Sequence, residues 1–176
     1  TLAAQVPETY TTQSISLENM DINTARQALA TGLDEGALLM NYIGHGGLDR
    51  LTGEGLLMKT DVDGLTNQDR LPVLAGMTCL AGRFEIPGVD AIGESLVIKE
   101  NGGAIAAWVP TGLSLNHLAR TLNQGLFRSI FHEDETVLGD AILAALKAYK
   151  DENPTSDRQF MLDIYTLIGD PAMALR

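Results

Sequence analysis

The chain has 176 residues, enough for one compact domain or a large part of one, and 45% of them are hydrophobic, as in an ordinary globular protein. The formal net charge is −11 and the Lys and Arg residues are scattered, so the chain repels phosphate backbones and we expect no nucleic-acid partner. No apolar run reaches the ~20 residues needed to cross a bilayer, so no membrane span is expected. The chain starts without Met and without the basic and apolar regions of a signal peptide, and we expect a segment upstream of it.

The first third of the chain predicts a helix followed by a buried strand. Asp21 is suited to cap a helix over residues 22–31, whose apolar residues fall on one face. Residues 37–43 (ALLMNYI) form a short apolar run that ends in Gly-His-Gly-Gly at 44–47, which is typical of a buried strand. The polar, Gly-rich residues 48–70 predict a loop with one short helix.

Two further buried strands are predicted in the middle of the chain. Residues 72–78 (PVLAGMT) lead directly to Cys79, and residues 104–109 (AIAAWV) are stopped by Pro110. Between them, residues 90–100 predict a helix that ends at an Asn-Gly-Gly sequence.

The last third predicts two amphipathic helices and a short strand. Ser114 is suited to cap a long helix whose apolar face runs to Ile130, and a second helix covers residues 138–149. Residues 152–158 (ENPTSDR) predict a polar loop, and residues 164–168 a last strand. This alternation predicts an α/β fold with a mostly parallel sheet flanked by helices. Four strands make a narrow sheet, so we expect the fold to be incomplete on its N-terminal side.

Cys79 is the one cysteine, so it forms no internal disulfide, and no Cys/His cluster predicts zinc. Alone it would be read as a small buried side chain. Its position argues otherwise, because His45 and Cys79 each follow a predicted strand. Loops at the carboxyl ends of parallel strands hold the ligand site in such sheets. An imidazole beside a thiol favours the thiolate–imidazolium pair of a cysteine hydrolase. The backbone N–H groups of Gly46 and Cys79 are predicted to hold the oxyanion.

The order and context of His45 and Cys79 resemble the caspase-like clan of cysteine peptidases, and within it the gingipain family. The residues that carry the resemblance lie between about residues 37 and 175: 41–46 (NYIGHG), 71–73 (LPV), 79–84 (CLAGRF), 93–96 (GESL), 102–106 (GGAIA) and 165–171 (YTLIGDP). There are departures from the family pattern. Gly47 stands where the family often has Ser, a Trp usually found shortly after is absent, and the acidic residue that orients the histidine is not located here.

The resemblance implies that residues 1–176 are the C-terminal part of a caspase-like catalytic domain. It implies an endopeptidase with a Cys79–His45 dyad, polypeptide substrates, further segments of the same precursor as partners, and a secreted or cell-surface location in a bacterium. Two alternatives stay open: a caspase-like binding or secretion-associated module with little proteolysis, and a peptidase-like acyl transferase. No cofactor is predicted. Some relatives bind calcium, so the resemblance leaves calcium open as a ligand, but Asp61 and Asp63 lack the ligand spacing of an EF-hand and no calcium site is assigned.

Substrate contacts are predicted in the segment that follows the third strand, which the resemblance places at the primary specificity pocket. Trp108, Thr111 and Ser114 are its candidate substrate-binding residues, and the alternative for Trp108 is a core residue of the buried strand. The segment holds no carboxylate, and a pocket for Arg or Lys needs a buried negative charge. Either a carboxylate comes from elsewhere, such as an upstream segment, or the preference is for residues that are not basic, and we expect the second. His117 and His132 fall in predicted helices, and we interpret them as packing or surface residues.

Overall fold

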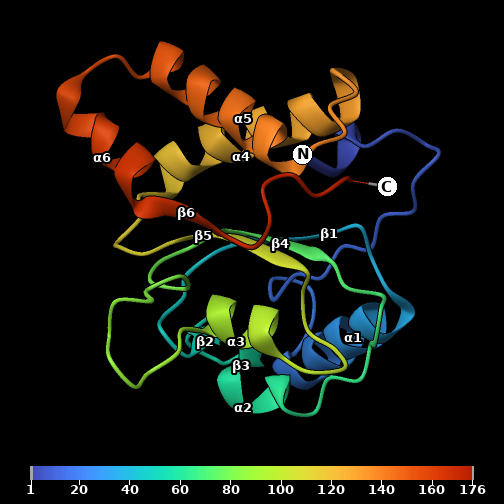
Figure 1. The fold of residues 1–176 in the computed structure, drawn as a ribbon. Coiled ribbons are helices and arrows are strands. Elements are labelled where there is room, and N and C mark those ends of the chain that lie inside the picture. Colours follow the sequence, from blue (N-terminus) through green and yellow to red (C-terminus); the bar gives the residue numbers. More distant parts are fainter. Residues whose placement is uncertain (1, 176) are drawn as a thin grey trace.

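The computed structural model of the chain describes residues 2–175, apart from the side chain of Ser156. Within this range a four-stranded sheet lies between two helical layers (Figure 1). Its strands are β1 (Leu39–Ile43), β4 (Val73–Met77), β5 (Ala106–Pro110) and β6 (Tyr165–Ile168), in the spatial order β1-β4-β5-β6. The pairs β1/β4 and β4/β5 are parallel, and β6 is antiparallel to β5. The predicted mostly parallel sheet flanked by helices is confirmed.

The upper layer in Figure 1 holds α4 (Asn116–His132), α5 (Leu138–Glu152) and α6 (Ser156–Ile164), and the short helix η1 (Leu2–Gln5) lies against α4. The lower layer holds α1 (Ile22–Glu35), α2 (Lys59–Val62) and α3 (Ile92–Ile98), beside a two-stranded ribbon of β2 (Arg50–Leu51) and β3 (Leu57–Met58). Within the described residues no helix is both long and apolar enough to cross a membrane.

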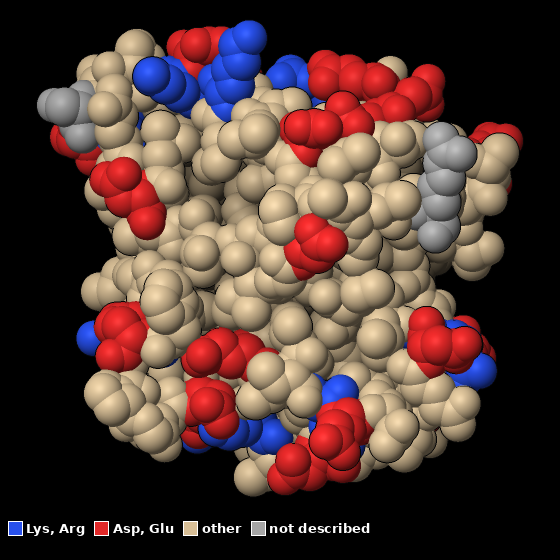
Figure 2. Space-filling view, viewed as in Figure 1, with Lys and Arg blue, Asp and Glu red and all other residues tan. Residues whose placement is uncertain are grey.

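The sheet separates two hydrophobic cores because side chains alternate along each strand. Val73, Ala75 and Met77 of β4 pack with α4 and α5, whereas Leu74 packs on the opposite side with α1 and α3. All five residues of β4 and all five of β5 are buried, which explains their continuous apolar sequences. On the face shown in Figure 2, charged side chains gather over the helical layers, and the band between them is mostly uncharged.

Most predicted elements are present, with shifted ends. The carboxylate of Asp21 accepts hydrogen bonds from the N–H groups of Asn23 (3.0 Å) and Thr24 (3.1 Å), so its predicted capping role is confirmed. Ser114 does not cap α4, whose N-cap is Leu115 without a side-chain bond; this prediction was wrong. The Ser114 hydroxyl is buried and lies 3.0 Å from the Tyr165 hydroxyl.

The short helix η1, the helix α6 and the β2–β3 ribbon were not predicted. Helix α6 begins inside the sequence interpreted as a polar loop, and the β2–β3 ribbon lies in the segment interpreted as a loop with a short helix. Strands of two residues carry too few positions for a recognisable alternation, so the ribbon has no clear sequence signal.

Candidate active site

The strands that precede His45 and Cys79 are direct neighbours in the sheet. Leu39 pairs with Val73, and the register continues to Ile43 with Met77. The N–H of Gly44 donates to the carbonyl of Met77 (3.2 Å), so the two chains stay together past the ends of the strands. His45 and Cys79 each stand two residues beyond the last pair. The pairing of β1 with β4 that the sequence argument required is therefore present.

His45 lies in a loop whose backbone is held from two sides. Its carbonyl accepts hydrogen bonds from the Tyr42 hydroxyl (2.6 Å) and from the N–H of Thr52 (2.8 Å). The N–H of Gly47 donates to the carbonyl of Arg50 (3.0 Å), which closes the loop into a short antiparallel bridge. Burial raises the pKa of Tyr42 to about 12, so this hydroxyl stays protonated and able to donate across the physiological range. The His45 residue itself is exposed.

Cys79 is a free, partly exposed cysteine held against the loop that follows β5. The N–H of Ser114 donates to its Sγ (3.4 Å), and the carbonyl of Ser114 lies 3.6 Å from Sγ. The N–H of Leu80 donates to the carbonyl of Gly112 (3.1 Å), so a second backbone bond joins the same two loops. Leu80 has a φ of 60°, a left-handed conformation that non-glycine residues adopt rarely and that recurs at functional sites.

Gly46 lies against the residue that precedes Cys79. A Cβ atom added at Gly46 would overlap Oγ1 of Thr78, so only glycine allows this close approach of the two loops. Among the residues that the structure describes, neither the N–H of Gly46 nor that of Cys79 donates to a protein acceptor. Both groups are left for a ligand or for solvent, as a predicted oxyanion site requires.

The three predicted substrate-binding residues lie in different environments. Trp108 is 1% exposed in the core beneath α4, with its ring 5.5 Å from that of Tyr165, so its side chain does not line a surface in this structure. The Thr111 hydroxyl donates to the carbonyl of Ile164 (3.1 Å) and stays partly exposed. Ser114 meets Cys79 through its backbone, while its side chain points into the core.

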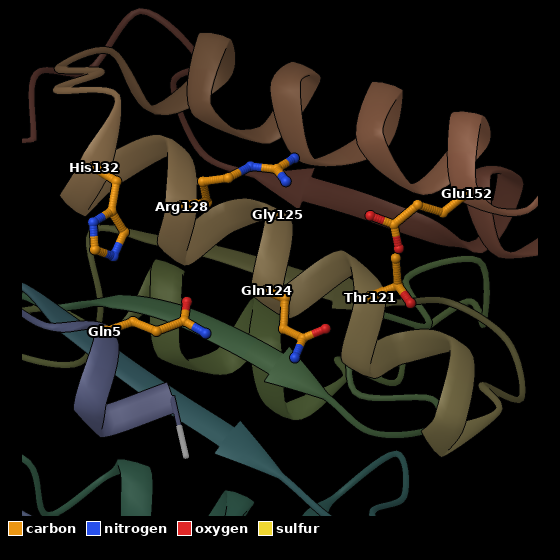
Figure 3. Close-up of a pocket in the computed structure, with 7 residues that line it drawn as sticks. All are labelled: Gln5, Thr121, Gln124, Gly125, Arg128, His132 and Glu152. Carbon is orange, nitrogen blue, oxygen red and sulfur yellow. The ribbon is translucent and has the colours of Figure 1, made fainter.

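Hollows lie on other parts of the surface. A polar hollow of about 450 Å³ lies between η1, α4 and α5. Figure 3 shows the residues that line it: Gln5, Thr121, Gln124, Gly125, Arg128, His132 and Glu152. A second hollow of about 500 Å³ lies between α1 and the segment that includes β3 and α2. Neither includes His45 or Cys79. We call the first one the polar hollow below.

A calcium site is not supported at Asp61. Its carboxylate pairs with Arg26 (2.7 Å) and accepts a hydrogen bond from the N–H of Met58 (2.8 Å), which is a structural use of both oxygens. Across residues 2–175, no group of three or more His, Cys, Asp and Glu side chains is placed to hold a metal ion.

Sequence reasoning missed two parts of the candidate site. Tyr42 looked like one more apolar residue of a buried strand, because a sequence does not reveal which carbonyl its hydroxyl will reach. Ser114 looked like a helix cap, since Ser is common at that position. Its real contribution comes from a backbone N–H, which every residue except proline carries and which leaves no signal in a sequence.

A strand-end histidine and a strand-end cysteine on neighbouring parallel strands are the arrangement expected of a cysteine peptidase. The comparisons with known proteins agree with this class. The family model described as "Peptidase family C25" matches residues 2–176. The chain therefore belongs to peptidase family C25, the gingipain family of cysteine peptidases.

The relatives are distant and longer than this chain. Gingipain R2 of Porphyromonas gingivalis is 28% identical over 159 residues, which are 80% of this chain and 20% of the relative. Gingipain R1 of the same species is 27% identical over 80% of this chain and 15% of its own length. The chain thus spans about a fifth or less of these curated relatives.

Solved structures of gingipains share the fold. The crystal structure of the Arg-specific cysteine proteinase gingipain R (RgpB) has a TM-score of 0.77 at 22% identity, over 90% of this chain and 37% of that one. The complex of P. gingivalis RgpB pro- and mature domains gives the same TM-score at 23% identity, over 86% and 37%. The predicted caspase-like α/β fold is confirmed, and the likeness covers part of each neighbour.

Proposed function

We propose that this chain supplies the catalytic dyad of a cysteine endopeptidase, with Cys79 as nucleophile and His45 as general base and acid. The observation that carries the proposal is the β1–β4 register. Ile43 and Met77 are opposite each other, and His45 and Cys79 each follow by two residues. Because the two strands are parallel neighbours with backbones ~4.8 Å apart, an equal offset brings both residues to the same edge of the sheet.

The proposed chemistry is acyl transfer in two steps. His45 takes the thiol proton while Sγ of Cys79 forms a bond to the carbonyl carbon of the scissile peptide. The carbonyl oxygen gains negative charge and accepts hydrogen bonds from the N–H groups of Gly46 and Cys79. The C–N bond then breaks, His45 gives its proton to the leaving amine, and an acyl-enzyme remains. Water, deprotonated by His45, hydrolyses the thioester and restores the thiol.

The contacts around Cys79 support a reactive rather than a structural thiol. A thiol that only fills the core would be buried, whereas Cys79 is partly exposed. The N–H of Ser114 donates to Sγ, and the thiol in turn donates to the Ser114 carbonyl, so backbone groups hold the sulfur in place.

The partners and the location are proposals of the same kind. As a peptidase the protein acts on polypeptides, and a solved neighbour is a complex of pro- and mature domains, so we propose that further segments of its own precursor also contact this domain. We propose a secreted or cell-surface location from the family resemblance. Immunodetection in culture medium and surface fractions checks the location, and finding the protein only in the cytosol would contradict it.

The dyad is tested by alkylation of the protein at its full natural length. Iodoacetamide should label Cys79 near neutral pH faster than it labels a free thiol such as glutathione, and His45→Ala should slow the labelling. His132→Ala, in the polar hollow, is the matched control and should leave the rate unchanged. Cleavage of a casein substrate should disappear in Cys79→Ala. Labelling rates that do not depend on His45, or cleavage that survives in Cys79→Ala, would contradict the dyad.

A further inference from the structure

The sulfur of the proposed nucleophile is held by one residue of the loop that follows β5. Ser114 donates its backbone N–H to Sγ of Cys79 (3.4 Å), and its carbonyl lies 3.6 Å from the same atom. A further bond between the two loops joins the N–H of Leu80 to the carbonyl of Gly112 (3.1 Å). Any shift of Ser114 therefore moves both backbone groups that contact the sulfur.

The side chain of Ser114 is buried in the core between the sheet and the upper helical layer. The residue is 8% exposed, and its Oγ lies 3.0 Å from the hydroxyl oxygen of Tyr165, where either oxygen can donate. Its other hydrogen bond, to Sδ of Met161 at 3.9 Å, is weak because a thioether is a poor acceptor. The Tyr165 hydroxyl is therefore the stronger of the two anchors of this side chain.

Tyr165 keeps its hydroxyl proton well beyond neutral pH. It is 6% exposed, and burial raises its pKa well above the ordinary value of 10.0, while the nearby Cys79 raises the pKa further. Because the phenol stays neutral, it can hold Ser114 without placing a negative charge close to a Cys79 thiolate.

The phenol is carried by a rigid part of the fold. Tyr165 begins β6 and pairs with Pro110, the last residue of β5 (Figure 1). Its ring lies 5.5 Å from that of Trp108. One residue earlier, the carbonyl of Ile164 accepts hydrogen bonds from the N–H (2.8 Å) and the hydroxyl (3.1 Å) of Thr111. A side chain whose own backbone and ring are fixed in this way can hold another residue in place.

We propose that Tyr165 is a positioning residue of the peptidase: its hydroxyl fixes Ser114, and Ser114 fixes Sγ of Cys79. This inference rests on the proposed function. The sulfur has to meet the substrate carbonyl carbon within a narrow range of positions, and a misplacement of about 1 Å can cost ~10²-fold in rate. Because Tyr165 is buried and contacts no substrate, its loss should lower kcat and leave KM nearly unchanged.

The first test removes the hydroxyl and keeps the ring. In the protein at its full natural length, Tyr165→Phe should lower kcat for fluorescently labelled casein by about tenfold and leave KM within about twofold of the wild type. Tyr149→Phe is the matched control, because Tyr149 is buried in the same core and donates its hydroxyl to the carbonyl of Arg158 (2.8 Å). Both variants should lose similar thermal stability, so a fall in kcat confined to Tyr165→Phe does not come from unfolding.

A double-mutant cycle tests the path through Ser114. Ser114→Ala keeps the backbone groups that contact Sγ and removes only Oγ, so it should lower kcat about as much as Tyr165→Phe does. If the two hydroxyls act as one unit, the variant that carries both substitutions should be no slower than either single variant.

The outcomes separate this inference from the proposed function. Equal kcat values for Tyr165→Phe and Tyr149→Phe would overturn the positioning role, and the proposed function would stand if cleavage still disappears in Cys79→Ala. Losses that multiply in the double variant would overturn the path through Ser114, because the two hydroxyls would then act separately. If the wild type cleaves no casein and alkylation of Cys79 does not depend on His45, the proposed function fails, and the positioning role fails with it.

Discussion

Two regions of the molecule can be compared as candidate functional sites: the carboxyl ends of the strands, and the polar hollow between η1, α4 and α5. The hollow has the denser set of polar side chains, including Arg128, His132 and Glu152. The strand ends have one histidine, one thiol and a surrounding surface of glycines and exposed apolar residues. A search for the greatest density of polar groups would choose the hollow.

The difference lies in how each group is held. At the strand ends the backbone of His45 is fixed by Tyr42 and Thr52, and Sγ of Cys79 by Ser114. In the hollow, Arg128 forms a half-exposed ion pair with Glu133 (3.4 Å), a contact of small energetic value. Catalysis depends on groups already in place, so backbone-anchored residues at strand ends identify a site better than polar density does.

The largest difference in activity is expected when the histidine of each region is replaced by alanine in turn. We expect His45→Ala to lower kcat/KM for peptide cleavage by about 10²–10⁴-fold, the usual contribution of a general base. His132→Ala should change it by less than about twofold. Steady-state kinetics of both variants measures the contrast. Equal losses, or a loss confined to His132→Ala, would move the active site to the hollow.

A smaller effect on activity is expected from alanine substitutions at two adjacent glycines. A methyl group at Gly46 overlaps the side chain of Thr78, whereas one at Gly47 meets its nearest neighbour, a carboxylate oxygen of Asp49, only at 4.0 Å. Gly46→Ala should displace an oxyanion donor and reduce kcat by about 10²-fold, with Gly47→Ala as the control near wild-type activity. Similar kcat values for the two variants would argue against an oxyanion role for the Gly46 N–H.

The comparison of the two regions also shows which features can be predicted from the sequence. The fold class and the strand-end places of His45 and Cys79 follow from features encoded locally: apolar runs of strand length, helical periodicity and the glycines beside His45. The pairing of β1 with β4 was assumed from the general behaviour of parallel sheets, and the structure confirms it. Residues that act through their own type and their position after a strand are visible in a sequence.

Residues that act through long-range contacts cannot be recognised in a sequence. The Ser114 N–H reaches Cys79 across 35 positions, and the buried face of Trp108 depends on α4 and on Tyr165 far along the chain. Trp108 was therefore predicted to contact substrate although it also fell in a predicted buried strand, and the structure buries it in β5. Helix α6 was hidden by the polar residues of its first turns, because its stability comes from packing on the rest of the upper layer.

A third prediction compares two tyrosines that each donate a hydrogen bond to a backbone carbonyl. Tyr42 bonds His45 (2.6 Å), and Tyr149 bonds Arg158 (2.8 Å) in the upper helical layer. Removing either hydroxyl should cost about 1 kcal/mol of stability, so thermal unfolding midpoints should fall by similar amounts. Only Tyr42→Phe should also slow alkylation of Cys79, by a fewfold, because it loosens the loop that carries His45. Slower alkylation in Tyr149→Phe as well would point to a general loss of stability.

The smallest effect is expected in the alkaline titration of Tyr42. Burial raises the pKa of Tyr42 from its ordinary 10.0 to about 12, so between these values the folded protein keeps a proton that the unfolded chain loses. The stability tied to this proton is complete below pH 10 and declines as the pH rises to about 12.

The absorbance of tyrosinate near 295 nm, recorded for wild type minus Tyr42→Phe, isolates this one hydroxyl. The difference should develop around pH 12, and below about pH 9 the two proteins should titrate alike. A difference centred near pH 10 would mean that water reaches the hydroxyl, and the Tyr42 bond would then no longer distinguish the strand-end loop from an ordinary surface loop.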